Sequence, residues 1–148
     1  MNQTFARNLS VAATLLLIGG AVFLIYQNSL FSSNRVVISV QVASGLLMIW
    51  ARFTFGLRSF HAAANPTEGS LITHGPYRFV RNPIYSAIWI FTWSGISVHL
   101  SLVNVLAGIV ILIALGIRIA CEESFLITHF TDYPAYAKRT ARLIPFLL

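Results

Sequence analysis

Charged residues are scarce in this chain. Ten Lys and Arg and four Asp and Glu make up only 9% of its 148 residues. Soluble domains typically carry about a quarter charged residues, so this scarcity excludes an ordinary soluble globular domain. Hydrophobic residues account for 57% of the chain, and the mean hydropathy is +0.76. The composition therefore predicts an integral membrane protein.

Cysteine is also nearly absent. The single Cys121 cannot form an internal disulfide, and no metal-ligand spacing accompanies it or the four histidines, so we expect no metal site. The formal net charge of +6 is spread along loops and helix ends without a basic face, which argues against nucleic acid as a partner. The sequence also lacks a glycine-rich phosphate loop and a nucleophile–base pattern.

Long hydrophobic runs are what the chain has in abundance. A span needs about 20 apolar residues at about 1.5 Å rise each, and four runs are long enough, or nearly so. We expect a single domain over residues 1–148, an all-α bundle of four transmembrane helices, or five. The first run is longer than the apolar core of a signal peptide and no clean cleavage site follows it, which favours a retained helix. The predicted helices cover residues 9–26, 36–57, 83–98 and 102–120.

The basic residues are distributed unevenly about these four helices. With four spans, the N-terminus, the loop 58–82 and the tail 121–148 share one side, and the opposite side holds only Arg35. The positive-inside rule makes the richer side cytoplasmic. We therefore expect both termini, the loop and a C-terminal helical segment in the cytoplasm. The basic residues on that side are Arg7, Arg52, Arg58, Arg78, Arg81, Arg118, Lys138, Arg139 and Arg142.

The densest polar cluster, residues 73–85, stands where the third helix begins. Asn82-Pro83 predicts that helix start, because Asn favours the N-cap and Pro the first helical turn. The unpaired N–H groups there, with Arg78 and Arg81 nearby, could hold a carboxylate or a phosphate. Arginines beside a span are also what positive-inside topology requires. We interpret these two as topological rather than catalytic.

Two adjacent carboxylates, Glu122 and Glu123, follow the fourth apolar run and oppose the positive-inside trend. Arg118 precedes Glu122 by four residues, so both side chains project from one helix face. One interpretation is an ion pair that neutralises itself. The other is a binding face, on which Glu122 receives a cationic or hydrogen-bond-donating cofactor and Arg118 orients an anionic group of a lipophilic substrate.

Together these motifs resemble the isoprenylcysteine carboxyl methyltransferase family. The resemblance covers the chain from Leu71 to its end. It implies a membrane methyltransferase that uses S-adenosylmethionine without a soluble Rossmann-type domain, as a short prokaryotic member in a bacterial or archaeal inner membrane. The matching pattern is Gly75-Pro76-Tyr77-Arg78-x-x-Arg81-Asn82-Pro83-x-Tyr85, then Glu122-Glu123-x-x-Leu126, then Phe130, Tyr133, Tyr136 and Pro145.

The resemblance also implies roles for individual residues. Arg118 corresponds to the catalytic arginine that faces the substrate carboxylate. The chain departs from the family where Asn82 and Gly69 stand in place of histidines and where Thr131 replaces a glycine. It is also shorter than the eukaryotic enzymes, so no prenylated-protein substrate is inferred. The implied cofactor-binding residues are Leu71, Ile72, Tyr77, Asn82, Pro83, Ile84, Tyr85 and Glu122.

The predicted function is methyl transfer from S-adenosylmethionine to a small amphiphilic or lipid-like acceptor taken from the membrane, a carboxylate being one candidate group. Because the methyl group of this cofactor is already activated, alignment is the main task, and a carboxylate nucleophile needs no general base. Two alternatives stay open: an NADPH-dependent membrane reductase, since such enzymes share an Arg-x-Pro-x-Tyr element, and a non-catalytic membrane component. The acceptor atom and the oligomeric state are not determined by the sequence.

Overall fold

The computed structural model describes residues 3–56 and 71–144. This part of the chain is all-helical, which confirms the all-α part of the predicted fold class. Its one β pairing is an isolated parallel bridge between Val80 and Ala141. The elements are α1 (Gln3–Tyr26), α2 (Arg35–Phe55), the short 3-10 helix η2 (Gly75–Arg78), α3 (Pro83–Val98), α4 (Leu102–His129) and α5 (Tyr133–Arg139).

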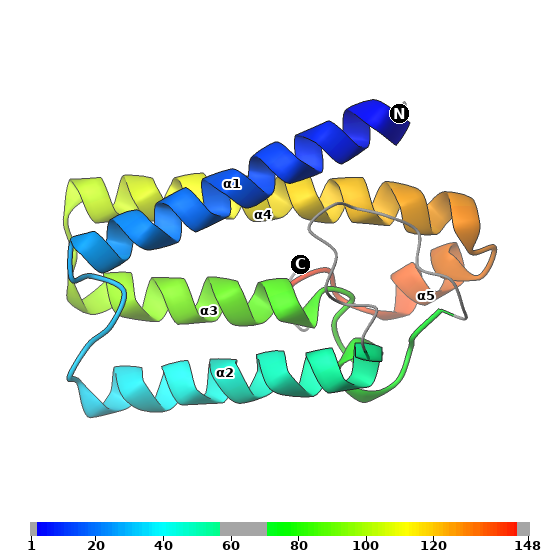
Figure 1. Cartoon of the computed structure of the whole chain (residues 1–148). Coiled ribbons are helices and arrows are strands. Elements are labelled where there is room, and N and C mark those ends of the chain that lie inside the picture. The colour runs from blue at the N-terminus through cyan, green and yellow to red at the C-terminus, as the bar shows by residue number, and fades with distance from the viewer. Residues whose placement is uncertain (1–2, 57–70, 145–148) are drawn as a thin grey trace.

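The four long helices lie side by side in the order α1, α4, α3 and α2, with α1 crossing α4 at an angle (Figure 1). The end of α2, the start of α3 and the end of α4 meet η2 and α5 at one end of the bundle, and the N-terminal end of α1 points the same way (Figure 1). We call this end the α5 end. Segments far apart in sequence therefore come together there.

Three helices are long and apolar enough to cross a membrane, judged by length and composition over the described residues: Thr4–Tyr26, Arg35–Phe55 and Leu102–His129. α3 has 16 residues, which span about 24 Å at 1.5 Å per residue, less than the roughly 30 Å of a hydrocarbon core. The predicted membrane association is supported by these three helices. A fourth span, formed by α3, stays a prediction.

Two helix boundaries differ from the sequence-based prediction by more than two residues, while α2 starts one residue earlier and ends two residues earlier than predicted. α1 begins at Gln3 rather than Leu9, because Ala6, Ser10 and Ala13 continue one buried face at helical spacing. Ala6 packs there in a cluster with Cys121 and Phe125 of α4. α4 runs without a break past Ala120 to His129. The helix therefore carries Glu122 and Glu123 within a continuous structure rather than beyond its end.

The opposite end of the bundle is fastened by polar contacts to the connection between α1 and α2. Gly95 permits this connection to lie against α3, since a Cβ on Gly95 would stand 2.2 Å from the Leu30 carbonyl oxygen. Gln41 Nε2 donates to that same carbonyl at 2.7 Å, and Asn104 Nδ2 donates to Ser29 Oγ at 2.8 Å. These bonds fix the helices at the end remote from α5.

Some sequence-based expectations fall outside the described residues. The family position at Gly69 belongs to the stretch 57–70, and Pro145 follows the last described residue.

Candidate functional site

The start of α3 departs in one respect from the predicted capping. Asn82 is the N-cap and Pro83 follows at the first helical position, but the Asn82 side chain makes no capping hydrogen bond. Its Nδ2 instead donates to the Arg142 carbonyl oxygen at 3.1 Å and to Glu123 Oε1 at 3.4 Å. The Asn82 side chain therefore binds the C-terminal segment and α4 rather than its own helix.

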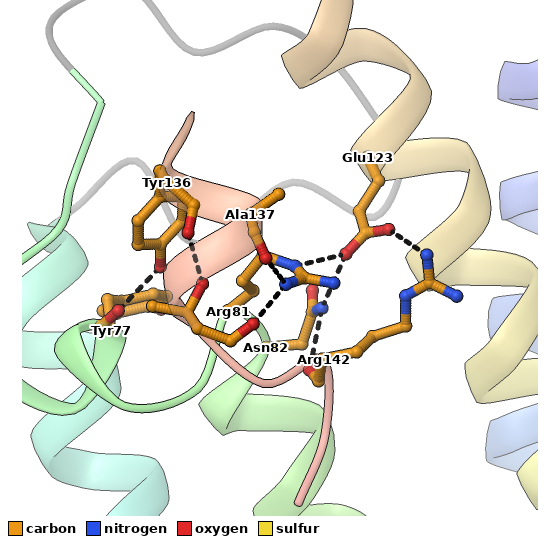
Figure 2. A network of polar contacts seen from close by, with 8 residues as sticks. Tyr77, Arg81, Asn82, Glu123, Tyr136, Ala137 and Arg142 are labelled. Atoms are coloured by element: carbon orange, nitrogen blue, oxygen red, sulfur yellow. Dashed lines mark hydrogen bonds and ion pairs between the residues drawn. The ribbon is translucent and has the colours of Figure 1, made fainter. Parts of the chain in front are cut away.

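Glu123 is buried and forms the centre of a charged network at the α5 end (Figure 2). Its Oε1 accepts from Arg81 Nε at 3.0 Å, and its Oε2 pairs with Arg142 Nη2 at 2.9 Å. Arg81 also donates through Nη1 to the Ala137 carbonyl at 2.6 Å and to the Thr140 carbonyl. We call Arg81, Asn82, Glu123 and Arg142 the tail clasp, because they join the segment after α5 to α3 and α4.

η2 is attached to the same C-terminal segment. Tyr136 Oη donates to the Tyr77 carbonyl oxygen at 2.7 Å, and the Tyr77 ring lies 5.7 Å from that of Phe55. Gly75 begins the turn at φ +60°, where a Cβ would stand 2.7 Å from the Thr54 hydroxyl oxygen. Burial, then Tyr136 and the negative charge of Glu122, raise the pKa of Tyr77. The Tyr77 hydroxyl therefore stays neutral.

A second polar cluster lies between α1, α3 and α4. Arg118 Nη2 pairs with Glu122 Oε1 at 2.8 Å, and Arg118 Nε donates to Tyr85 Oη at 2.8 Å. Tyr85 Oη in turn donates to Glu122 Oε1, and Arg118 Nη1 donates to Thr14 Oγ1. We call Arg118, Glu122, Tyr85 and Thr14 the Arg118 cluster. It combines one cation, one anion and a phenol hydroxyl that bonds to both.

The Arg118 cluster presents groups of both signs in a largely apolar bundle. The Arg118 side chain is 9% exposed and that of Glu122 is 29% exposed. Intramembrane charges are costly and usually face a partner or a ligand. The sequence allowed two interpretations of Arg118 and Glu122, an ion pair or a binding face. In this structure the two side chains form an ion pair. The Glu122 carboxylate nevertheless stays partly exposed, so the arrangement is suited to exchange a partner for a ligand.

The structure brings together only some of the residues predicted for the site. Tyr85, Arg118 and Glu122 are in contact, and Tyr77 lies in η2, where its carbonyl oxygen accepts from Tyr136. Asn82 belongs to the tail clasp. The remaining predicted residues lie close in sequence to the start of α3. Leu71 and Ile72 are half-buried and precede η2. Pro83 is buried and Ile84 is half-buried, both in the first turn of α3.

Sequence reasoning missed two contributions. Arg81 was interpreted as topological, whereas it pairs with Glu123 and holds two tail carbonyls. Thr14 was not considered at all, although it bonds to Arg118 from α1. A polar side chain inside an apolar run is itself a signal of function in a membrane helix, so Thr14 could have been selected as a candidate.

Comparison with known families gives one match. The family described as phospholipid methyltransferase matches residues 35–133, more than half of the chain. This is the family of membrane methyltransferases that resemble the isoprenylcysteine carboxyl enzymes, so the resemblance drawn from the sequence motifs is confirmed. The matched region includes Tyr85, Arg118 and Glu122, and it begins after α1. Comparisons with curated proteins and with solved structures found no match.

Proposed function

Because the chain belongs to the phospholipid methyltransferase family, we propose that it transfers a methyl group from S-adenosylmethionine to a lipid-like acceptor at the Arg118 cluster. Family membership supports the coarser statement that it is a membrane methyltransferase. The observation that carries the proposal is the meeting of Tyr85, Arg118 and Glu122 across α3 and α4, inside the matched region.

The charges of the cluster fit this cofactor and an anionic acceptor. S-adenosylmethionine carries a methyl group on a positively charged sulfonium, which makes that group ready for transfer to a nucleophile. Glu122 is the partly exposed carboxylate of the cluster and suits a cationic or N–H-bearing part of the cofactor. Arg118 is the more deeply buried group, and it suits the anionic part of an acceptor that enters from the lipid.

Tyr85 has a separate part in this proposal. Its hydroxyl accepts from Arg118 and donates to Glu122, so it keeps the two charged groups at a fixed spacing. Fixed spacing matters because methyl transfer needs the acceptor nucleophile in line with the donor methyl group, and alignment supplies much of the rate. Tyr77, Asn82 and the first turn of α3 are proposed to line the cofactor side.

We place the site on the cytoplasmic side of the membrane. The α5 end carries the basic residues near the termini of α1, α2, α3 and α4, while Arg35 starts α2 at the other end. The positive-inside rule therefore orients the α5 end toward the cytoplasm, where S-adenosylmethionine is available. In this arrangement α3 acts as the fourth span, and both termini are cytoplasmic.

Titration with S-adenosylhomocysteine tests the proposal directly. Purified protein in a detergent that preserves its helical circular dichroism is titrated in a calorimeter with this product, and in parallel with NADPH. Binding of S-adenosylhomocysteine alone supports the methyltransferase. Binding of NADPH alone would indicate the reductase alternative, and binding of neither would reject the proposed function.

The acceptor is sought with labelled cofactor. The protein is incubated with tritiated S-adenosylmethionine and, separately, with a fatty acid, with phosphatidylethanolamine and with an apolar thiol. These three probes present a carboxylate, an amine and a thiol. Label in the organic extract identifies the acceptor atom, which the family name alone does not establish.

A further inference from the structure

Helix α1 contributes a polar side chain to the proposed site although it precedes the matched family region, residues 35–133. α1 packs along α4 for most of its length (Figure 1). Thr14 lies on the face of α1 that carries the buried Ser10, and its hydroxyl contacts Arg118. The guanidinium is therefore held from α1 as well as from α3 and α4.

The direction of the Thr14 hydrogen bonds is determined by their chemistry. Thr14 Oγ1 donates its only proton to the Ser10 carbonyl oxygen at 2.9 Å. A hydroxyl has one donor and two lone pairs, so toward Arg118 this oxygen acts as an acceptor. Arg118 Nη1 is the donor. The backbone of α1 therefore orients the Thr14 oxygen toward the guanidinium.

The neutral hydroxyls of Thr14 and Tyr85 affect Arg118 differently from the charged carboxylate of Glu122. The ion pair with Glu122 offsets the positive charge, and it competes with any cofactor group that Glu122 binds. Thr14 and Tyr85 bond to the guanidinium without adding a negative charge. Because each bonds to a different nitrogen, they fix the plane of the guanidinium even when Glu122 turns to another partner.

We propose that Thr14 is a positioning residue of the acceptor site, which keeps the Arg118 guanidinium in the orientation that receives the anionic group of a lipid-like acceptor. This inference rests on the proposed function, since it assumes that Arg118 meets the acceptor. It assigns to α1, which lies outside the family match, a direct effect on acceptor binding. It assigns to Thr14 no contact with the cofactor.

Three variants separate positioning from packing. Thr14→Val keeps the shape of the side chain and removes the hydroxyl, and Thr14→Ser restores it. Ser44→Ala on α2 is the matched control, because the buried Ser44 hydroxyl makes the same kind of bond, to the Val40 carbonyl at 2.8 Å. A hydrogen bond to a charged group contributes enough that its loss changes an equilibrium by about tenfold.

The kinetic test compares the effect of each variant on the KM of the acceptor with its effect on the Kd of S-adenosylhomocysteine. We expect Thr14→Val to raise the KM of the acceptor found with labelled cofactor by about tenfold, while the Kd of S-adenosylhomocysteine changes less than about twofold. Thr14→Ser and Ser44→Ala should both stay near the wild type. An unchanged acceptor KM in Thr14→Val, or equal losses in Thr14→Val and Thr14→Ser, would overturn the proposal.

A second readout needs neither activity nor ligand. In nitrogen NMR spectra, a guanidinium held on several sides shows separate signals for its two terminal nitrogens, whereas rotation averages them. We expect separate Arg118 signals in the wild type and in Thr14→Ser, and faster exchange between the two signals in Thr14→Val, where Tyr85 and Glu122 still hold the guanidinium but Nη1 has lost its bond to Thr14. An unchanged exchange rate in Thr14→Val would contradict the role given to Thr14. Failure of the wild type to bind S-adenosylhomocysteine would instead reject the proposed function, so the two failures are distinguishable.

Discussion

Glu122 and Glu123 are neighbours in the sequence, yet they belong to two regions with different physical character. Glu123 lies in the tail clasp, where Arg81 and Arg142 engage its two oxygens and its side chain is 9% exposed. Glu122 lies in the Arg118 cluster, and its side chain is 29% exposed. The comparison separates two roles. The enclosed carboxylate joins the C-terminal segment to α3 and α4, and the more exposed one is the carboxylate that we propose binds the cofactor.

Removing the enclosed carboxylate should have the largest effect on stability. Glu123→Ala leaves Arg81, whose side chain is 11% exposed, without its carboxylate, and breaking a buried pair typically costs about 3–5 kcal/mol. Denaturant unfolding in detergent, followed by circular dichroism, measures this loss. Glu122→Ala is the matched comparison and should be destabilised less. Equal losses for the two variants would remove the distinction between the regions.

Removing the open carboxylate should instead affect ligand binding. We expect Glu122→Ala to weaken S-adenosylhomocysteine binding by about tenfold or more, because a charge-assisted hydrogen bond to the cofactor is lost. Arg118→Ala should weaken it less and should act mainly on the acceptor. Calorimetric titration of both variants gives the ranking. The reverse order would show that the roles of Glu122 and Arg118 have been exchanged.

Within the tail clasp, the two arginines should differ. Arg142 is 57% exposed, so solvent screening limits its pair with Glu123 to about 0–1 kcal/mol. Arg81 is buried and also bonds to two carbonyls, so Arg81→Ala should lower the free energy of unfolding by several times more than Arg142→Ala. Unfolding of the two variants under the same conditions measures this difference. A larger loss of unfolding free energy in Arg142→Ala than in Arg81→Ala would contradict this ranking of the two arginines.

The contact between Tyr136 and Tyr77 should make stability depend on alkaline pH. Burial raises the pKa of Tyr136 from 10.0 to about 12. A raised folded pKa means that its contribution is fully present below the unfolded pKa and is lost as the pH rises from about 10 toward 12. Tyr136→Phe lacks this group, so its deficit in unfolding free energy relative to the wild type should narrow over that window. A constant deficit from pH 9 to about 12 would contradict the assigned burial.

Part of this arrangement was predictable from the sequence. The apolar runs predict the long helices, and the spacing of four residues predicts that Arg118 and Glu122 share a face. The family resemblance implied that Tyr85 and Glu122 belong to one cofactor site, and the two side chains are in contact. These predictions succeed because they use local helical geometry or the order of motifs along the chain.

The separation of the two glutamates could not be predicted in the same way. Successive helical residues point about 100° apart, but which direction faces the C-terminal segment depends on how that segment folds back. Thr14 and Arg118 are 104 residues apart, so their contact depends on how α1 packs on α4. The side chain of Asn82 could not be placed from the sequence either. It bonds to the Arg142 carbonyl oxygen instead of capping α3, and this contact depends on the tertiary fold.

The central claim is that Glu122, and not Glu123, belongs to the cofactor site. The most direct test compares Glu122→Gln with Glu123→Gln by calorimetric titration with S-adenosylhomocysteine, at a temperature where circular dichroism shows both variants folded. We expect Glu122→Gln to bind S-adenosylhomocysteine at least about tenfold more weakly than the wild type, and folded Glu123→Gln to bind it within about twofold of the wild type. Weakened binding in Glu123→Gln with unchanged binding in Glu122→Gln would contradict the claim.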